Sequence, residues 1–346
     1  PNLISVFQDP TTFDQVGKVG IGDIDISDDG RYLFVMNLFD RKLYRIDLQN
    51  ANSPVTPTAA QVTSWAVPNP NPGGANPAGE HRPFALKVYR GKVFVGMVSS
   101  GQNAAGTPAA NNASMNAYIY EFDPTASGGA GAFNNTALLT VPLNYTKGIA
   151  TFVTGCDVAA FANWHPWVSV NPAACGANNR ASYPEPILSD IEFDDQDGSI
   201  IMAFSDRYGH QMQRDNNGPA DAAIDWNPRS GGDILRAYKN AGCTSWTIES
   251  GGDKDGTGPY VATAAQINTQ GPGGGEFYNL DNWFNPGTER HQETILGGLL
   301  LLPGSQEIMA TLYDPIVGNA FTEGVTRYSN TNGANNNDYQ IVGDVA

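Results

Sequence analysis

The most regular feature of the chain is a succession of short stretches in which apolar and polar residues alternate. In residues 22–37, one such stretch meets the sequence Asp-Asp-Gly, a tight-turn signal, and a second stretch rich in β-branched and aromatic residues follows. A further turn leads into residues 43–47, and residues 61–67 are the fourth stretch. The alternation and the turns predict a four-stranded antiparallel meander.

This pattern returns later in the chain, which indicates an internal repeat. Further copies start near residues 85, 190 and 298, each with two apolar strands around a turn and a third strand after it. Because such a sheet hides an apolar face only by stacking on the next sheet, repeated meanders are typical of a β-propeller. Since a blade needs about 40–50 residues, we expect an all-β propeller of about five to seven four-stranded antiparallel blades.

We expect the whole chain, residues 1–346, to form a single domain with long loop insertions. Its hydrophobic fraction of 40% is typical of a folded protein. The chain opens with Pro1 in place of Met, so we expect a processed or excerpted chain. Stretches without strand periodicity, many of them rich in Gly, Ala, Asn and Pro, place the insertions at about 68–80, 99–115, 154–186, 208–231 and 250–290.

The charge balance excludes two classes of partner. A formal net charge of -16 repels a phosphate backbone, so we expect no nucleic-acid binding. No apolar run reaches the length of about 18 residues that a spanning helix needs, so we expect no membrane insertion. An acidic surface suits the capture of divalent cations, although it also serves simply to keep a protein dispersed.

One of the insertions contains two of the three cysteines, Cys156 and Cys175. A disulfide between them staples a loop that has little core of its own, and this is the pairing that we expect. A reduced pair is the alternative, and we expect Cys243 to be free or buried. The same loop carries Trp164 and Trp167, which form either an exposed binding knob or the cap of a blade interface.

Polar residues gather near the starts of the predicted first strands, which converge on the central channel of a propeller. The candidate binding residues at this channel mouth are Asp23, Arg82, Asp190, His291 and Glu293. Of these, Asp23, Asp190 and Glu293 are candidate metal ligands. Calcium, which prefers oxygen ligands, is the cofactor that they fit. The alternative is that each carboxylate caps a turn or pairs with Arg82.

The chain offers little for nucleophilic catalysis, and we expect no catalytic residue. No motif such as Gly-x-Ser-x-Gly occurs, and His291 with Glu293 is the best acid–base pair. The acidic turns at 28–30 and 194–198 resemble calcium loops. However, the helix–loop–helix calcium pattern needs a Glu six residues after its Gly, and the residue six places after Gly198 is Phe204. We therefore expect both segments to be hairpin turns.

Four segments of the repeat together resemble the propeller-like region of large secreted bacterial surface proteins. In those proteins the region often precedes tandem Ig-like B-type repeats of the serine-aspartate adhesin kind, which this sequence does not contain. The segments are VGIGDIDISDDGRYLFVMNLFDRKLYRIDL, RPFALKVYRGKVFVGMV, PILSDIEFDDQDGSIIMAFSDRYG and HQETILGGLLLLPGSQEIMATLYDP. The resemblance implies a secreted, extracellular or cell-surface protein with an adhesive or structural role, and it carries over no catalytic residue.

The chain is therefore predicted to be an extracellular binding or structural module of a bacterial surface protein, and not an enzyme. Its role is expected to be adhesion or self-assembly, in one version as a filament subunit. The expected partners are an extracellular polymer, a cell-surface component or copies of the chain itself. The alternative is a metal-dependent propeller hydrolase or lactonase, which requires a divalent ion held by converging carboxylates in the channel.

Overall fold

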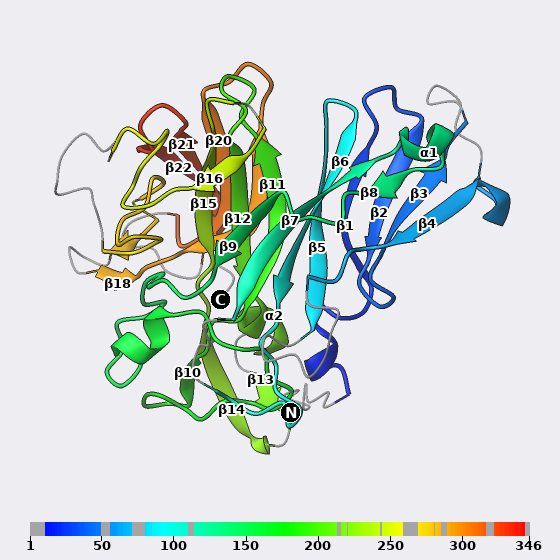
Figure 1. Cartoon of the computed structure of the whole chain (residues 1–346). Helices are drawn as coiled ribbons and strands as arrows, with labels where there is room; N and C mark the ends of the chain where they lie inside the picture. The colour runs from blue at the N-terminus through cyan, green and yellow to red at the C-terminus, as the bar shows by residue number, and fades with distance from the viewer. Residues whose placement is uncertain are drawn as a thin grey trace.

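The computed structural model confirms an all-β fold that contains several four-stranded antiparallel sheets (Figure 1). It describes residues 11–49, 56–70, 80–109, 114–212, 216–219, 221–242, 244–258, 269–279, 281–284, 289–315 and 322–342.

Four sheets follow one another along the chain, and we call them the first to fourth blades. The first contains β1 (Ile21–Ile26), β2 (Tyr32–Asn37), β3 (Lys42–Asp47) and β4 (Val62–Ala66). The second contains β5 (His81–Tyr89), β6 (Lys92–Ser99) and β7 (Asn116–Asp123), with β8 (Ala132–Phe133) and β9 (Leu139–Pro142) both paired to β7. The third contains β11 (Pro186–Phe193), β12 (Ile200–Asp206), β15 (Asp233–Lys239) and β16 (Trp246–Ile248). The fourth contains β19 (Ile295–Leu301), β20 (Glu307–Tyr313), β21 (Glu323–Ser329) and β22 (Asn335–Val342).

Two smaller sheets and a few short helices complete the described part of the chain. One small sheet has the order β10 (Arg180–Ser182), β14 (Asp221–Arg229) and β13 (Asn216–Gly218), and the other pairs β17 (Trp283–Phe284) with β18 (Glu289–His291). The helices are α1 (Ala126–Gly129), α2 (Arg207–Met212), η1 (Phe13–Gln15), η2 (Ala59–Gln61) and η3 (Ala159–Ala162). None of the helices in the described residues is long and apolar enough to cross a membrane.

The four blades stack on one another in chain order. Their inner strands, β1, β5, β11 and β19, pack side by side in that sequence, and Figure 1 shows the blades as a fan from the first at the right to the fourth at the left. A hydrophobic cluster fills each of the three joints between successive blades. The described residues form four blades, where we expected about five to seven. Within them β19 does not pack extensively against β1, so the blades form an open arc.

The acidic segments between first and second strands are hairpin turns, as predicted. In the first blade, Asp29 accepts hydrogen bonds from the Ser27 hydroxyl and from a backbone amide, and Gly30 takes a positive φ of 70°. In the third blade, Asp194 and Asp197 both accept hydrogen bonds from the Arg236 guanidinium. These side chains are therefore satisfied by the protein itself, and the sequence signal reports turn formation.

Parts of the insertion predicted at 154–186 pack into the core, namely residues 164–168 and 181–186, while residues 157–160 and 177–179 are exposed. The disulfide between Cys156 and Cys175 is confirmed. The prediction of an exposed binding knob is wrong, because Trp164 and Trp167 are both buried in the hydrophobic cluster between the second and third blades. Their ring N–H groups donate to the Tyr145 hydroxyl and to a backbone carbonyl, so the alternative, a cap over a blade interface, is confirmed.

The other predicted insertions are only partly described. The insertion at 208–231 contains most of α2 together with β13 and β14, so it is not simply a loop. The remaining ones, at 68–80, 99–115 and 250–290, each include residues outside the described ranges. Cys243 also lies outside the described residues, so its predicted state stays a prediction.

Candidate metal centre

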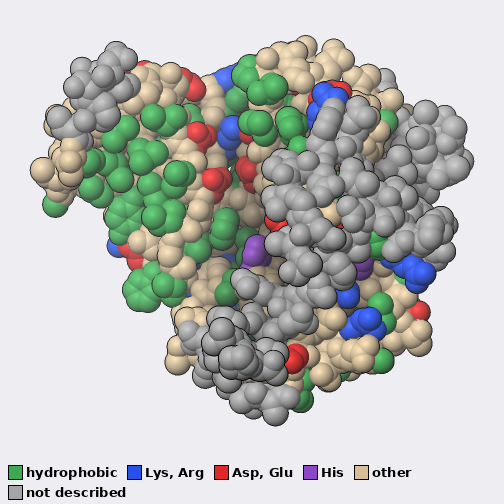
Figure 2. All heavy atoms as spheres, turned by 180° about the vertical axis from the view of Figure 1, so that it is seen from behind, with side chains coloured by type: hydrophobic (Ala, Val, Ile, Leu, Met, Phe, Trp, Pro, Cys, Tyr) green, Lys and Arg blue, Asp and Glu red, His purple; other side chains and the backbone are tan. Residues whose placement is uncertain are grey.

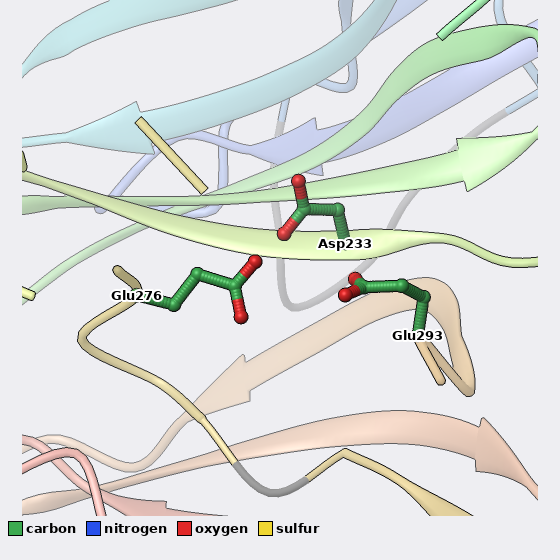
Figure 3. Close-up of side chains that lie close together, drawn as sticks. All are labelled: Asp233, Glu276 and Glu293. Atoms are coloured by element: carbon green, nitrogen blue, oxygen red, sulfur yellow. The ribbon is translucent and has the colours of Figure 1, made fainter. Parts of the chain in front are cut away.

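Three buried carboxylates meet beside the third and fourth blades. Asp233, Glu276 and Glu293 each offer one oxygen, and these oxygens lie within 4.8 Å of one another. Figure 3 shows the three carboxylates turned toward a common point. Asp233 is the first residue of β15, Glu276 follows a glycine-rich loop, and Glu293 lies just before β19. All three side chains are buried, so the cluster is shielded from water.

Unusual backbone conformations bring these segments together. Glu293 has a φ of 59°, in the left-handed region that a residue with a side chain seldom adopts. Gly148 has a φ of 124°, and a Cβ atom at this position would lie 2.4 Å from Oε1 of Glu293. At Gly271 a Cβ atom would lie 2.4 Å from Cγ of Glu276. Only glycine permits the close approach at these two points, so the backbone is shaped around the two glutamates.

The carboxylates repel one another in a medium of low polarity. Neither oxygen of Glu293 has a hydrogen-bond partner in the described residues, and burial raises the pKa of this side chain well above its usual value. The neighbouring Asp281 and Glu276 carboxylates raise it further. Burial also raises the pKa of Asp233 to about 6, even though the Tyr145 hydroxyl donates to its Oδ2. When its carboxyl groups are ionised, a buried cluster of this kind needs a positive charge close by to offset the cost of burial.

Lys147 supplies positive charge at the cluster, but not enough to balance it. Its buried ammonium lies 3.4 Å from the Gly232 carbonyl oxygen and 4.9 Å from the centroid of the Trp164 ring. This one ammonium faces several buried carboxylates whose pKa it lowers, namely those of Asp206, Asp233, Asp281 and Glu293. Among the described residues negative groups therefore outnumber the positive one. Either bound protons or a cation must make up the difference, and hard divalent cations such as calcium prefer carboxylate oxygens.

Two of the three predicted metal ligands lie elsewhere. Asp23 Oδ2 accepts a hydrogen bond from the backbone N–H of Leu86 at 2.9 Å, and Asp190 Oδ2 accepts one from Leu299 at 2.7 Å. Both carboxylates therefore connect the inner strand of one blade to that of the next. The predicted set Asp23, Asp190 and Glu293 is wrong because the first two satisfy backbone amides. Glu293 alone of the three belongs to the cluster.

The other two residues of the predicted channel mouth also have separate surroundings. Arg82 pairs with Glu80 and lies over the Trp167 ring. His291 directs Nδ1 to the Ala150 carbonyl oxygen at 2.9 Å, and burial lowers its pKa to about 4. The structure therefore does not bring the five candidates together. Nor does it form the predicted acid–base pair, since no hydrogen bond joins His291 to Glu293 in the described residues.

Comparisons with known proteins give distant matches. No family model matches the chain. Colossin-A of Dictyostelium discoideum is 31% identical over 235 residues, which are 66% of this chain and 2% of that protein. Colossin-B of the same organism is 27% identical over 187 residues, or 51% of this chain and 4% of that protein. The chain thus spans only a few per cent of the length of these relatives.

Solved structures with a similar arrangement include several enzymes. A periplasmic gluconolactonase of Pseudomonas aeruginosa matches with a TM-score of 0.36 and 10% identity, over 94% of this chain and 56% of that one. A glucose dehydrogenase matches with a TM-score of 0.36 and 10% identity, over 95% of this chain and 88% of that one. At this level of similarity neither a substrate nor a catalytic residue carries over to this chain.

The prediction that adhesion or self-assembly is the function of this chain, without any enzymatic activity, is wrong. The solved structures similar to this chain include a gluconolactonase, glucose dehydrogenases and a glycosidase of family 43. In addition, Trp164 and Trp167, the predicted binding knob, are buried in the core. The resemblance to the propeller-like region of bacterial surface proteins is tested by none of the comparisons and stays a prediction.

Proposed function

We propose that this chain is a divalent-metal-dependent hydrolase of the propeller type, with Asp233, Glu276 and Glu293 as ligands of the ion. The main support for this proposal is the environment of the Glu293 carboxylate. Its carboxylate is buried, both oxygens lack a hydrogen-bond partner in the described residues, and it faces two further carboxylates. A buried charge without a partner costs several kcal/mol, and a bound cation removes that cost. Calcium fits best, because it takes oxygen ligands in flexible geometry.

The surroundings of the ligands resemble the supporting shell of a metal site. The Tyr145 hydroxyl donates to Asp233, and the ring N–H of Trp164 donates to the Tyr145 oxygen at 3.0 Å. This chain of hydrogen bonds holds the Asp233 carboxylate in one orientation, as outer residues do in metal sites. The Lys147 ammonium lies over the Trp164 ring. It balances the negative charge of the carboxylates that a divalent ion does not neutralise.

The reaction class is hydrolysis of an uncharged ester, with a lactone as the first substrate to test. When bound, the ion polarises the ester carbonyl and lowers the pKa of a bound water molecule. A net charge of -16 disfavours anionic substrates and leaves neutral esters unaffected. Because the cluster is buried, substrate entry requires a segment beside it to move, and the loop 271–275, in which Gly273 and Gly274 are exposed, leads directly to Glu276.

Extracellular placement belongs to the same proposal. The disulfide between Cys156 and Cys175 supports it, because such bonds persist in oxidising compartments. Free calcium is also abundant enough outside cells for a site of modest affinity.

Hydrolysis of a lactone by the purified chain, before and after chelation, tests the proposed function. We expect turnover that is lost with EDTA and restored by calcium. The variant Glu293→Gln should lose turnover at all calcium concentrations, while Asp195→Asn, a change at an exposed acid of a hairpin turn, should keep it. Hydrolysis that survives chelation, or that survives Glu293→Gln in the folded protein, would sink the proposal.

A further inference from the structure

The two ends of the blade arc expose faces that are covered everywhere else in the molecule. The hairpin registers place one residue of each inner strand in an equivalent position, and these residues are Ile24, Leu86, Ile191 and Leu299. The residues two places further on are likewise equivalent: Ile26, Val88, Phe193 and Leu301. In the second, third and fourth blades, both positions pack against the preceding blade. In the first blade, Ile24 is 55% and Ile26 46% exposed.

The exposed apolar surface of the first blade extends across the whole sheet. Ile26 pairs with Leu33, Leu33 with Ile46, and Ile46 with Val62, so one row of apolar side chains crosses all four strands on this face. Figure 2 shows hydrophobic side chains gathered over this blade, which lies at the left of that view. A contiguous apolar face of this kind in a folded protein marks an interaction surface.

The opposite end of the arc is also uncovered. On β19 the side chain of Leu300 points away from the third blade and is 49% exposed, and Leu302, the residue just after the strand, is 55% exposed. Leu300 is equivalent to Lys87 of the second blade, whose ammonium reaches forward to Glu192 of the third at 2.8 Å. The fourth blade therefore presents the face that should receive a following blade, as the first presents the face that should receive a preceding one.

Hydrogen bonds between the inner strands of successive blades indicate which kind of blade can pack on the exposed face of the fourth blade. Asp23 of the first blade accepts from its own strand with Oδ1 and from the next blade with Oδ2. Asp190 of the third blade does the same. The second and fourth blades have Ala85 and Gly298 at this position and offer no acceptor. Acid-bearing and acid-free blades thus alternate along the arc.

A blade that follows the acid-free fourth blade must therefore satisfy its own inner-strand amides. The third blade does this behind the acid-free second blade, where Ile191 donates to Asp190 Oδ1 at 2.8 Å. The first blade is built in the same way, since Ile24 donates to Asp23 Oδ1 at 2.8 Å and Ile26 to Asp25 Oδ1 at 2.7 Å. A joint between a fourth and a first blade would repeat the joint between the second and third.

We propose that two copies of this chain close one eight-bladed ring, with the fourth blade of each copy packed on the first blade of the other. The two joints are related by a twofold axis along the channel, which is the commonest symmetry of soluble oligomers. Eight blades lie within the usual range for closed propellers. Closure covers both exposed apolar faces and leaves no open sheet face at either end. The inference stands independently of the proposed hydrolase activity.

The mass of the full chain in solution tests this, measured by size-exclusion chromatography with light scattering over a wide range of concentrations. We expect twice the 36.9 kDa of one chain. The variants Ile24→Glu and Leu300→Glu each bury a charge in both joints of the ring, and each should weaken the dimer by at least about 100-fold. Phe39→Glu, at an exposed residue of the turn between β2 and β3, is the matched control and should leave the dimer intact.

Three results would overturn the proposal. A monomer at all concentrations would mean that some other blade covers these faces. Polymers larger than a dimer would mean that the arc does not close. A dimer that both glutamate variants preserve would place the interface elsewhere. Circular dichroism of each variant shows that the blades remain folded, so that loss of the dimer is not mistaken for unfolding.

Discussion

Replacing Asp233 with Asn should change the stability of the metal-free protein in a pH-dependent way. Burial raises the pKa of this carboxyl group from 3.8 to about 6 in the folded state. Folding therefore favours the protonated form, and the protein loses stability as the pH rises through the window from 3.8 to about 6. At about 1.36 kcal/mol per pKa unit, the loss is about 3 kcal/mol above that window. The asparagine variant carries no charge and escapes it.

Urea unfolding, followed by the fluorescence of the buried tryptophans, measures this difference. In EDTA at pH 8 the variant should be more stable than the parent by up to about 3 kcal/mol, and the two should converge below pH 4. Calcium at about 100 times its dissociation constant should then stabilise the parent by about 2.7 kcal/mol and the variant far less. A variant that is less stable than the parent in EDTA at pH 8 would refute the reasoning, because Lys147 and Tyr145 would then already stabilise the ionised carboxylate. Asp195→Asn controls for loss of a surface charge.

Three further predictions concern the frame around the site. Replacing Cys156 and Cys175 with Ser should lower the free energy of unfolding by about 3 kcal/mol, as expected for a loop of this size, and an unchanged urea midpoint would contradict this. Gly148→Ala should lower thermal stability and abolish calcium binding, whereas Gly128→Ala, with a positive φ but open space around it, should leave calcium titrations unchanged. Asp190→Ala leaves a backbone amide of the fourth blade without its acceptor and should cost about 1–3 kcal/mol, while Asp190→Asn should cost less; equal losses in urea unfolding would argue against the inter-blade hydrogen bond.

The repeat made the fold predictable from the sequence. Alternating strands around acidic turns report local structure, and residues such as Asp29 and Gly30 determine their turn without help from the rest of the chain. The four copies near residues 23, 85, 190 and 298 each became one blade. The disulfide was predictable for a similar reason, since two cysteines shared one long loop.

The site was largely unpredictable because it depends on contacts between distant segments. Glu276 follows a glycine run that looks like a linker in the sequence, and only the folded chain shows that Gly271 lets the backbone pass close to its side chain. Asp233 opens a strand and resembles the acids of the inner strands, which instead bind backbone amides of the next blade. A repeat reports which residues are equivalent, but it does not report which carboxylates find a donor.

The metal content of the purified, unchelated protein, measured by mass spectrometry, tests the central claim most directly. One calcium ion per chain, absent from Glu293→Gln and present in Asp195→Asn, is the result that the buried carboxylates predict. A folded parent protein that holds no divalent ion, even after incubation with calcium, would contradict it and would leave bound protons as the charge that balances Asp233, Glu276 and Glu293.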